Sequence, residues 1–205
     1  MNIKVKICGI QDLESAKAAF DAGADFLGFN FVPTSKRCLQ PELAREIIDR
    51  LPNTVKKVGV FMDAVVLEVN KLICYLRLDY VQLHGSESPE YLNGIVGAGV
   101  IKTFSLTSSF DLTETRERMR KYSSSYFLLD REIQGRGKSL DLEKVKQLAV
   151  LFPLFLAGGL TSMNVRKVLS VIAPFAVDVA GGVETKGMKD MKKIEKFIKE
   201  VKNYE

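Results

Sequence analysis

Two side chains in this sequence could exchange protons with a bound molecule. Cys8 and Asp130 each stand at the end of a short apolar run. A thiolate can remove a proton and a carboxylic acid can donate one, so the two could act as a general base and a general acid. Taken singly, each has an ordinary explanation. A buried cysteine more often only packs, and Asp130 could cap a loop or pair with Arg131 or Lys138.

Two pairs of adjacent glycines indicate an anion site. Gly158 and Gly159 follow one apolar run, and Gly181 and Gly182 follow the next. Glycine lets the backbone approach an anion closely, and successive N–H groups supply positive dipoles. One such pair is typical of any tight turn. Two pairs after consecutive runs predict a phosphate-binding site.

The elements that would position these residues alternate regularly along the chain. Short β-branched or aromatic runs predict strands at residues 3–8, 26–31, 57–62, 80–83, 100–104, 126–130, 153–157 and 176–179. Helical periodicity begins near Leu13, Pro41, Ala64, Pro89, Leu112, Leu142, Met163 and Lys189. Strands that alternate with helices pair in parallel through right-handed crossovers. We therefore predict an α/β protein, one single-domain (β/α)8 TIM barrel over residues 1–205, in preference to an open doubly wound sheet.

In such barrels the active site lies at the carboxyl ends of the strands. The polar or special residues predicted there are Cys8-Gly9, Asn30, Asp63, Gln82 with His84, Lys102, Asp130 and the two glycine pairs. Gln82, His84 and Asp178 are candidates for ligand contacts. His84 is the only histidine, and we expect it to position other groups and not to catalyse.

Composition narrows the class of protein. The chain has 205 residues and a formal net charge of +5, which suits an anionic small molecule. Many lysines lie in the C-terminal stretch, where they predict the solvent-exposed face of a helix. The apolar face of that helix would carry Met191, Ile194, Ile198 and Val201. We therefore expect no nucleic-acid partner. We expect no membrane segment, no metal and a cytoplasmic location. Three cysteines match no disulfide or zinc pattern, and Cys38 and Cys74 are assigned to packing.

Several motifs in order along the chain resemble those of phosphoribosylanthranilate isomerases. They span nearly the whole sequence, and as a set they are specific. They are Lys6-Ile7-Cys8-Gly9-Ile10, Gly28-Phe29-Asn30-Phe31, Pro33-Thr34-Ser35-Lys36-Arg37, Val58-Gly59-Val60-Phe61, Val81-Gln82-Leu83-His84-Gly85, Leu128-Leu129-Asp130, Ala157-Gly158-Gly159-Leu160, and the stretch from Pro174 through Val183-Glu184 to Lys189-Asp190.

The resemblance implies a ribulose-phosphate-binding barrel of tryptophan biosynthesis. Its reaction would be the Amadori rearrangement of N-(5′-phosphoribosyl)anthranilate to 1-(2-carboxyphenylamino)-1-deoxyribulose 5-phosphate, without metal or cofactor. Cys8 would be the general base and Asp130 the general acid. Arg37 would contact the anthranilate end of the substrate, although it could instead be a solvated loop cation. The phosphate would lie on Gly158, Gly159, Gly181 and Gly182. Such an enzyme would work as a monomer or a homodimer.

The chain departs from the family pattern in three places. Gln11 stands where the family usually has Thr, and Ala180-Gly181 where it usually has serines. The loop of Gly135, Arg136, Gly137 and Lys138 is also atypical. We expect the charges of Arg136 and Lys138 to point away from Asp130, whose pKa should be raised by burial. Backbone N–H groups after Cys8 should favour its thiolate.

Three other interpretations remain open. A related barrel of the histidine pathway would need a carboxylate where strand one has Cys8, and an indole-glycerol-phosphate synthase would need several lysines and glutamates, of which only Lys102 fits. A binding protein without turnover would keep the glycine loops. A redox or acyl-transfer role for Cys8 lacks a second cysteine nearby. Consumption of the anthranilate ribotide separates enzyme from binding protein.

Overall fold

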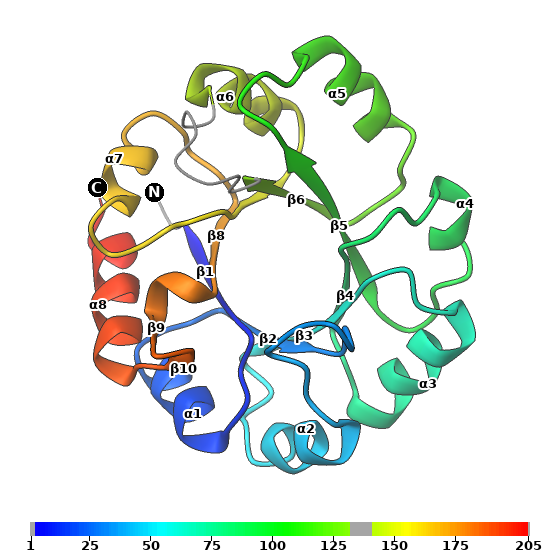
Figure 1. Cartoon of the computed structure of the whole chain (residues 1–205), viewed down its shortest axis with the longest axis vertical. Helices are drawn as coiled ribbons and strands as arrows, with labels where there is room; N and C mark the ends of the chain where they lie inside the picture. The colour runs from blue at the N-terminus through cyan, green and yellow to red at the C-terminus, as the bar shows by residue number, and fades with distance from the viewer. Residues whose placement is uncertain (1–2, 132–140, 205) are drawn as a thin grey trace.

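The computed structural model describes residues 3–131 and 141–204. Eight strands alternate with eight α-helices along the chain (Figure 1). The strands are β1 (Lys4–Cys8), β2 (Phe26–Asn30), β3 (Lys56–Phe61), β4 (Tyr80–Leu83), β5 (Gly99–Leu106), β6 (Tyr126–Arg131), β7 (Leu154–Leu156) and β8 (Ala176–Val179). The helices are α1 (Leu13–Asp21), α2 (Pro41–Ile48), α3 (Val66–Leu76), α4 (Pro89–Leu92), α5 (Leu112–Arg120), α6 (Leu142–Leu151), α7 (Val165–Leu169) and α8 (Met191–Lys202).

The eight strands close into a barrel. They follow chain order from β1 to β8, every pairing is parallel, and β8 pairs back onto β1. In Figure 1 the helices form an outer ring around the strands. The predicted (β/α)8 fold is confirmed. Because all strands are parallel, their carboxyl ends open on one face of the barrel.

Local sequence explains most helix starts. The side chain of Asp12 accepts a hydrogen bond from the N–H of Ser15 at 2.7 Å and caps α1. Pro41 and Pro89 occupy the first turns of α2 and α4, where no N–H is needed. Helix α7 differs from the prediction, because it begins at Val165 and its N-cap residue is Asn164. Thr161 instead accepts from the N–H of Met163 within the preceding turn.

The C-terminal helix was predicted correctly on its polar face and incorrectly at one apolar position. Ile194, Phe197, Ile198 and Val201 are buried, whereas Met191 is about half exposed. The helix also begins two residues later than predicted. Residues 184–189 form a hairpin of β9 (Glu184–Thr185) and β10 (Met188–Lys189), after the 3-10 turn η1 (Gly181–Val183).

The amino end of the barrel is filled by aromatic rings. Phe26, Tyr80 and Tyr126 begin their strands. The Tyr80 ring meets those of Phe26 and Tyr126, and these two rings also meet Phe155 and Phe175, at centroid distances of 4.5 to 6.4 Å. This plug fills the amino end of the barrel. No helix in the described ranges is long and apolar enough to cross a membrane.

Candidate active site

A pocket of about 810 Å³ opens at the carboxyl ends of the strands. It draws residues from strands and loops that are far apart in sequence. Every residue predicted to catalyse, to bind substrate or to bind phosphate lines it: Cys8, Arg37, Gln82, His84, Asp130, Gly158, Gly159, Asp178, Gly181 and Gly182. The thiol and the carboxyl group predicted to act together therefore share one cavity. Separate cavities would have excluded the acid–base hypothesis.

Cys8 stands directly above a buried ion pair. Lys6 precedes it by two residues on β1, so both side chains point to the same side of the strand. Lys6 pairs with Asp178 in the β1–β8 register, and its Nζ lies 3.0 Å from Asp178 Oδ1. Lys6 is fully buried and Asp178 nearly so. Asp178, predicted as a ligand contact, therefore also neutralises a charge inside the barrel.

The surroundings of Cys8 correct one expectation. The N–H groups of Gly9 and Ile10 both donate to the carbonyl of Gly28 at 2.9 Å, so they are already engaged by that acceptor. Burial raises the pKa of the Cys8 thiol, and the nearby ammonium of Lys6 opposes that rise. The favourable charge for a thiolate thus comes from a side chain below it and not from the following backbone.

Asp130 faces His84 across the pocket. Its carboxylate Oδ2 lies 3.6 Å from His84 Nε2, and both side chains are about one-third exposed. On the far side of the ring, Gln82 Nε2 lies 3.1 Å from His84 Nδ1. An amide nitrogen only donates, so Nδ1 is the acceptor and Nε2 carries the proton toward Asp130. Burial lowers the pKa of His84, which favours this neutral form.

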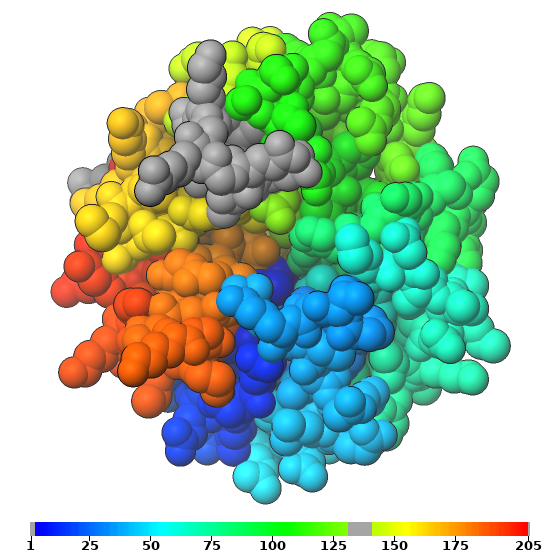
Figure 2. Space-filling model, in the orientation of Figure 1, coloured from blue at the N-terminus to red at the C-terminus, as the bar shows by residue number. Residues whose placement is uncertain are grey.

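Arg37, which lines the pocket, forms a bidentate ion pair with Glu184. Its Nε and Nη2 lie 2.6 and 2.9 Å from the two carboxylate oxygens of Glu184. Lys189 Nζ lies 2.9 Å from the same carboxylate and donates to the carbonyl of Ala180. Burial raises the pKa of Glu184, but the hydrogen bonds from Arg37 and Lys189 outweigh it and bring the pKa to about 2. Figure 2 shows the loop before α2, in blue, against the segment after β8, in orange.

Glycine is required where these loops meet. A Cβ on Gly9, which has φ of +78°, would stand 2.3 Å from Arg37 Cδ. A Cβ on Gly182 would stand 1.8 Å from the carbonyl oxygen of Leu160. The two predicted phosphate loops therefore touch through backbone alone. Gly158 and Gly159 both have positive φ, at 90° and 68°, which turns their backbone in a way that favours glycine.

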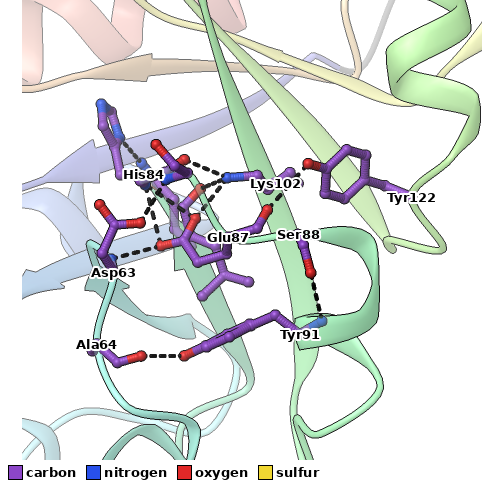
Figure 3. Close-up of polar contacts among 12 residues, drawn as sticks. Asp63, Ala64, His84, Glu87, Ser88, Tyr91, Lys102 and Tyr122 are labelled. Atoms are coloured by element: carbon purple, nitrogen blue, oxygen red, sulfur yellow. Dashed lines mark hydrogen bonds and ion pairs between the residues drawn. The ribbon is translucent and has the colours of Figure 1, made fainter.

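A second buried ion pair lies outside the pocket lining. Lys102 Nζ lies 2.6 Å from Glu87 Oε2 and donates to the carbonyl of Gly85 at 2.7 Å. Glu87 in turn accepts from the N–H groups of Asp63 and Gly85. Figure 3 shows these contacts clustered beside His84. Asp63 and Lys102, both predicted at strand ends, thus fix the loops after β3 and β4 on either side of His84.

Sequence reasoning missed Glu87, and it named Lys6, Glu184 and Lys189 only as parts of motifs or as a helix start. A signal existed for Lys6, because residues two apart on a strand share a face and Cys8 was already a candidate. No such signal existed for Glu87, which lies in a loop. Within the described part of the chain, no cluster of three or more His, Cys, Asp or Glu side chains could hold a metal ion. The predicted directions of Arg136 and Lys138 fall outside the described residues.

Comparison with known proteins identifies the family. The family model described as N-(5′-phosphoribosyl)anthranilate (PRA) isomerase matches residues 5–200. The chain belongs to this family. A relative from Desulforudis audaxviator, named N-(5′-phosphoribosyl)anthranilate isomerase, is 43% identical over 199 residues, covering 95% of this chain and 96% of that one.

Solved structures agree with the assignment. One describes monomers generated from the dimeric phosphoribosylanthranilate isomerase of Thermotoga maritima. It is 38% identical, covers 98% of both chains and has a TM-score of 0.86. Another family member, in complex with reduced 1-(o-carboxyphenylamino)-1-deoxyribulose 5-phosphate, is 38% identical over 98% of both chains with a TM-score of 0.87. The family membership favours an isomerase over the histidine-pathway barrel and the binding protein without turnover.

Proposed function

We propose that this chain isomerises N-(5′-phosphoribosyl)anthranilate to 1-(2-carboxyphenylamino)-1-deoxyribulose 5-phosphate in tryptophan biosynthesis, with Cys8 as general base and Asp130 as general acid. The observation that carries the assignment of roles is that the Cys8 thiol and the Asp130 carboxyl group line one pocket, together with both glycine loops. A sugar anchored by its phosphate on those loops would reach both groups.

The reaction needs two proton transfers at one sugar. Asp130 donates a proton to the ring oxygen of the ribose, and the ring opens to an iminium ion. Cys8 then removes the proton from C2′, and the resulting enolamine tautomerises to the ketone. Each transfer by a positioned group contributes about 10²–10⁴ in rate. His84 Nε2 lies 3.6 Å from the Asp130 carboxyl group, and His84 serves as a positioning residue.

The remaining residues would hold the substrate. Gly158, Gly159, Gly181 and Gly182 present backbone to the phosphate, which is the arrangement that suits an anion. The buried amide oxygen of Gln82 has no hydrogen-bond partner among the described residues, so a ligand hydroxyl or amine suits it. The guanidinium of Arg37 lies beside Gly181 and would pair with a substrate carboxylate or phosphate.

Replacing Cys8 by Ser tests the proposal. A serine hydroxyl is a far weaker base than a thiolate, so kcat should fall by about 10²–10⁴-fold while a phosphorylated product analogue binds with nearly unchanged affinity. Loss of substrate fluorescence measures turnover, and calorimetry measures binding. Cys74→Ser, on the exposed face of α3, is the matched control and should leave both quantities unchanged. Full activity of the Cys8→Ser variant would remove the base assignment.

We infer that residues 1–205 act as one catalytic unit without a cofactor, on a small phosphoribosyl substrate, as a monomer or a homodimer. The eight strands of the described part of the chain close into one barrel, and the pocket opens at their carboxyl ends. A cytoplasmic location fits a biosynthetic role and free cysteines. Sedimentation equilibrium distinguishes monomer from dimer, and full turnover after dialysis against a chelator would support cofactor independence.

A further inference from the structure

We propose that the buried Lys6–Asp178 ion pair is a positioning device for Cys8. In this arrangement the ammonium group of Lys6 is the counter-ion of the Cys8 thiolate, and the thiolate shares that ammonium with the carboxylate of Asp178. The inference rests on the proposed role of Cys8 as base, and it adds to that role the source of the charge that makes the base.

The geometry places the ammonium and the sulfur on the same side of Gly28. Gly28 pairs with Cys8 in the β1–β2 register. A Cβ on Gly28 would stand 2.9 Å from Cys8 Sγ and 3.1 Å from Lys6 Nζ. Both atoms thus crowd the same point, in space that only a glycine leaves open. The Lys6 ammonium also donates a hydrogen bond to Asp178 Oδ1 at 3.0 Å, so it lies between the carboxylate and the thiol, whose pKa it lowers.

The pair is otherwise hard to explain as a stabilising feature. Lys6 is among the largest fully buried side chains of the protein, and charged groups are costly to remove from water. An apolar pair of similar volume would fill the same layer of the barrel without that desolvation. A buried charge directly under a reactive thiol has a chemical use that an apolar side chain would not supply.

Other charged groups face Cys8 from the elements around it. Lys189 on β10 and Arg37 from the loop before α2 both interact electrostatically with the Cys8 thiol. Each of them is bound to the carboxylate of Glu184, which offsets much of their charge. Asp178 on β8 disfavours a thiolate and Lys6 on β1 favours it, while β2 presents the uncharged Gly28 at this level. Asp130 and His84 line the same pocket from β6 and the end of β4. Lys6 therefore differs from Lys189 and Arg37, because it approaches the thiol from inside the barrel and is not bound to Glu184.

Lys6 is positively charged and Asp178 is negatively charged, so removing each charge should shift the titration of Cys8 in opposite directions. In a Cys38→Ser/Cys74→Ser background, the rate of Cys8 alkylation by iodoacetamide is followed against pH by mass spectrometry of the Cys8 peptide. Lys6→Met should raise the pH midpoint by at least about one unit, which is about tenfold slower alkylation at neutral pH. Asp178→Asn should lower the midpoint, because the ammonium then has only the thiolate as its anionic partner.

Matched variants separate this effect from general damage. Lys102→Met breaks a different buried lysine–carboxylate pair and should leave the Cys8 midpoint unchanged. Where Lys6→Met does not fold, Lys6→Met/Asp178→Asn replaces it with a neutral pair, and the midpoint should again lie above that of the parent. An unchanged midpoint in the Lys6 variants, or a rise in Asp178→Asn, would overturn the inference.

The test does not depend on turnover. Alkylation reports the charge of Cys8 in the free enzyme, whereas Cys8→Ser kinetics report whether the thiol is the base. A shifted midpoint with an active Cys8→Ser variant would sink the proposed role alone. An unshifted midpoint with an inactive Cys8→Ser variant would sink the counter-ion role alone.

Discussion

The two halves of the pocket are built from different materials. The half at the ends of β1, β4 and β6 consists of ionisable side chains: Cys8 above the Lys6–Asp178 pair, in which Asp178 comes from within β8, and Asp130 opposite His84. The half over β7 and β8 consists of glycine backbone, where Gly182 touches the carbonyl of Leu160 so closely that no side chain fits. Side chains can change charge during a reaction, whereas backbone amides cannot. The first half therefore suits chemistry and the second suits holding an anion.

This division predicts which property of the enzyme a substitution in each half should impair. An isosteric change in the side-chain half should leave binding intact and remove turnover. A change in the backbone half should weaken binding, because any added atom moves the loop itself. Glu184 connects the two, since it follows the phosphate loop of β8 and holds Arg37, which crosses the β1 loop at Gly9.

Asp130→Asn should give the largest effect. The amide keeps the shape of the carboxyl group but cannot donate its acidic proton, so kcat should fall by about 10³–10⁴-fold. Affinity for a phosphorylated product analogue should change less than about threefold, which contrasts the two halves directly. Steady-state kinetics and calorimetry measure the two quantities. The control Asp79→Asn lies at the opposite end of the barrel, and a similar loss of kcat there would contradict the assignment.

Low pH should weaken the ion pair between Glu184 and Arg37, which connects the two halves. The pKa of Glu184 is about 2 in the folded protein against an ordinary 4.5, so its contribution is complete above pH 4.5 and is lost as pH falls toward 2. That difference corresponds to about 3 kcal/mol in the free energy of unfolding. Urea unfolding between pH 2.5 and 6 measures it. Glu184→Gln should show a flatter dependence than the parent, and parallel curves would contradict this pairing.

Gly182→Ala should chiefly damage the backbone half. Its Cβ would meet the Leu160 carbonyl oxygen at 1.8 Å, so the loops must separate, and overpacking of this kind costs about 1–3 kcal/mol. We expect inorganic phosphate or a product analogue to bind roughly 10- to 100-fold more weakly. Gly97 has a positive φ, which disfavours any side chain, and it does not line the pocket, so Gly97→Ala is the control and should lose stability without losing affinity. Unchanged binding in Gly182→Ala would break the comparison.

Ala180→Ser should give the smallest effect, with opposite sign. Ala180 lines the pocket where the family usually has a hydroxyl, so a serine there adds one donor for the phosphate. One such hydrogen bond is worth about 1 kcal/mol, or roughly fivefold in affinity. KM for the ribotide should fall with kcat nearly constant. A rise in KM would indicate that the phosphate lies elsewhere along these loops.

The sequence predicted the barrel because its signals are local and repeated. Alternating periodicity, the Asp12 cap and the first-turn prolines each follow from a few neighbouring residues. The strand ends then placed Cys8 and Asp130 on one face, and the glycine pairs on the same face. Errors occurred where tertiary contacts override local preference. Met191 has helical spacing but is half exposed, and Cys74, assigned to packing, is exposed on α3.

What the sequence by itself determined is the order of the strands, the face on which the reactive residues emerge and the family motifs they carry. Only the tertiary structure decided the electrostatics of the site. The pairing of Lys6 with Asp178, and of Glu87 with Lys102, joins residues 172 and 15 positions apart. Charge interactions depend on distance and burial in space, and barrel closure sets both, so the state of the Cys8 thiol depends on a strand from the other end of the chain.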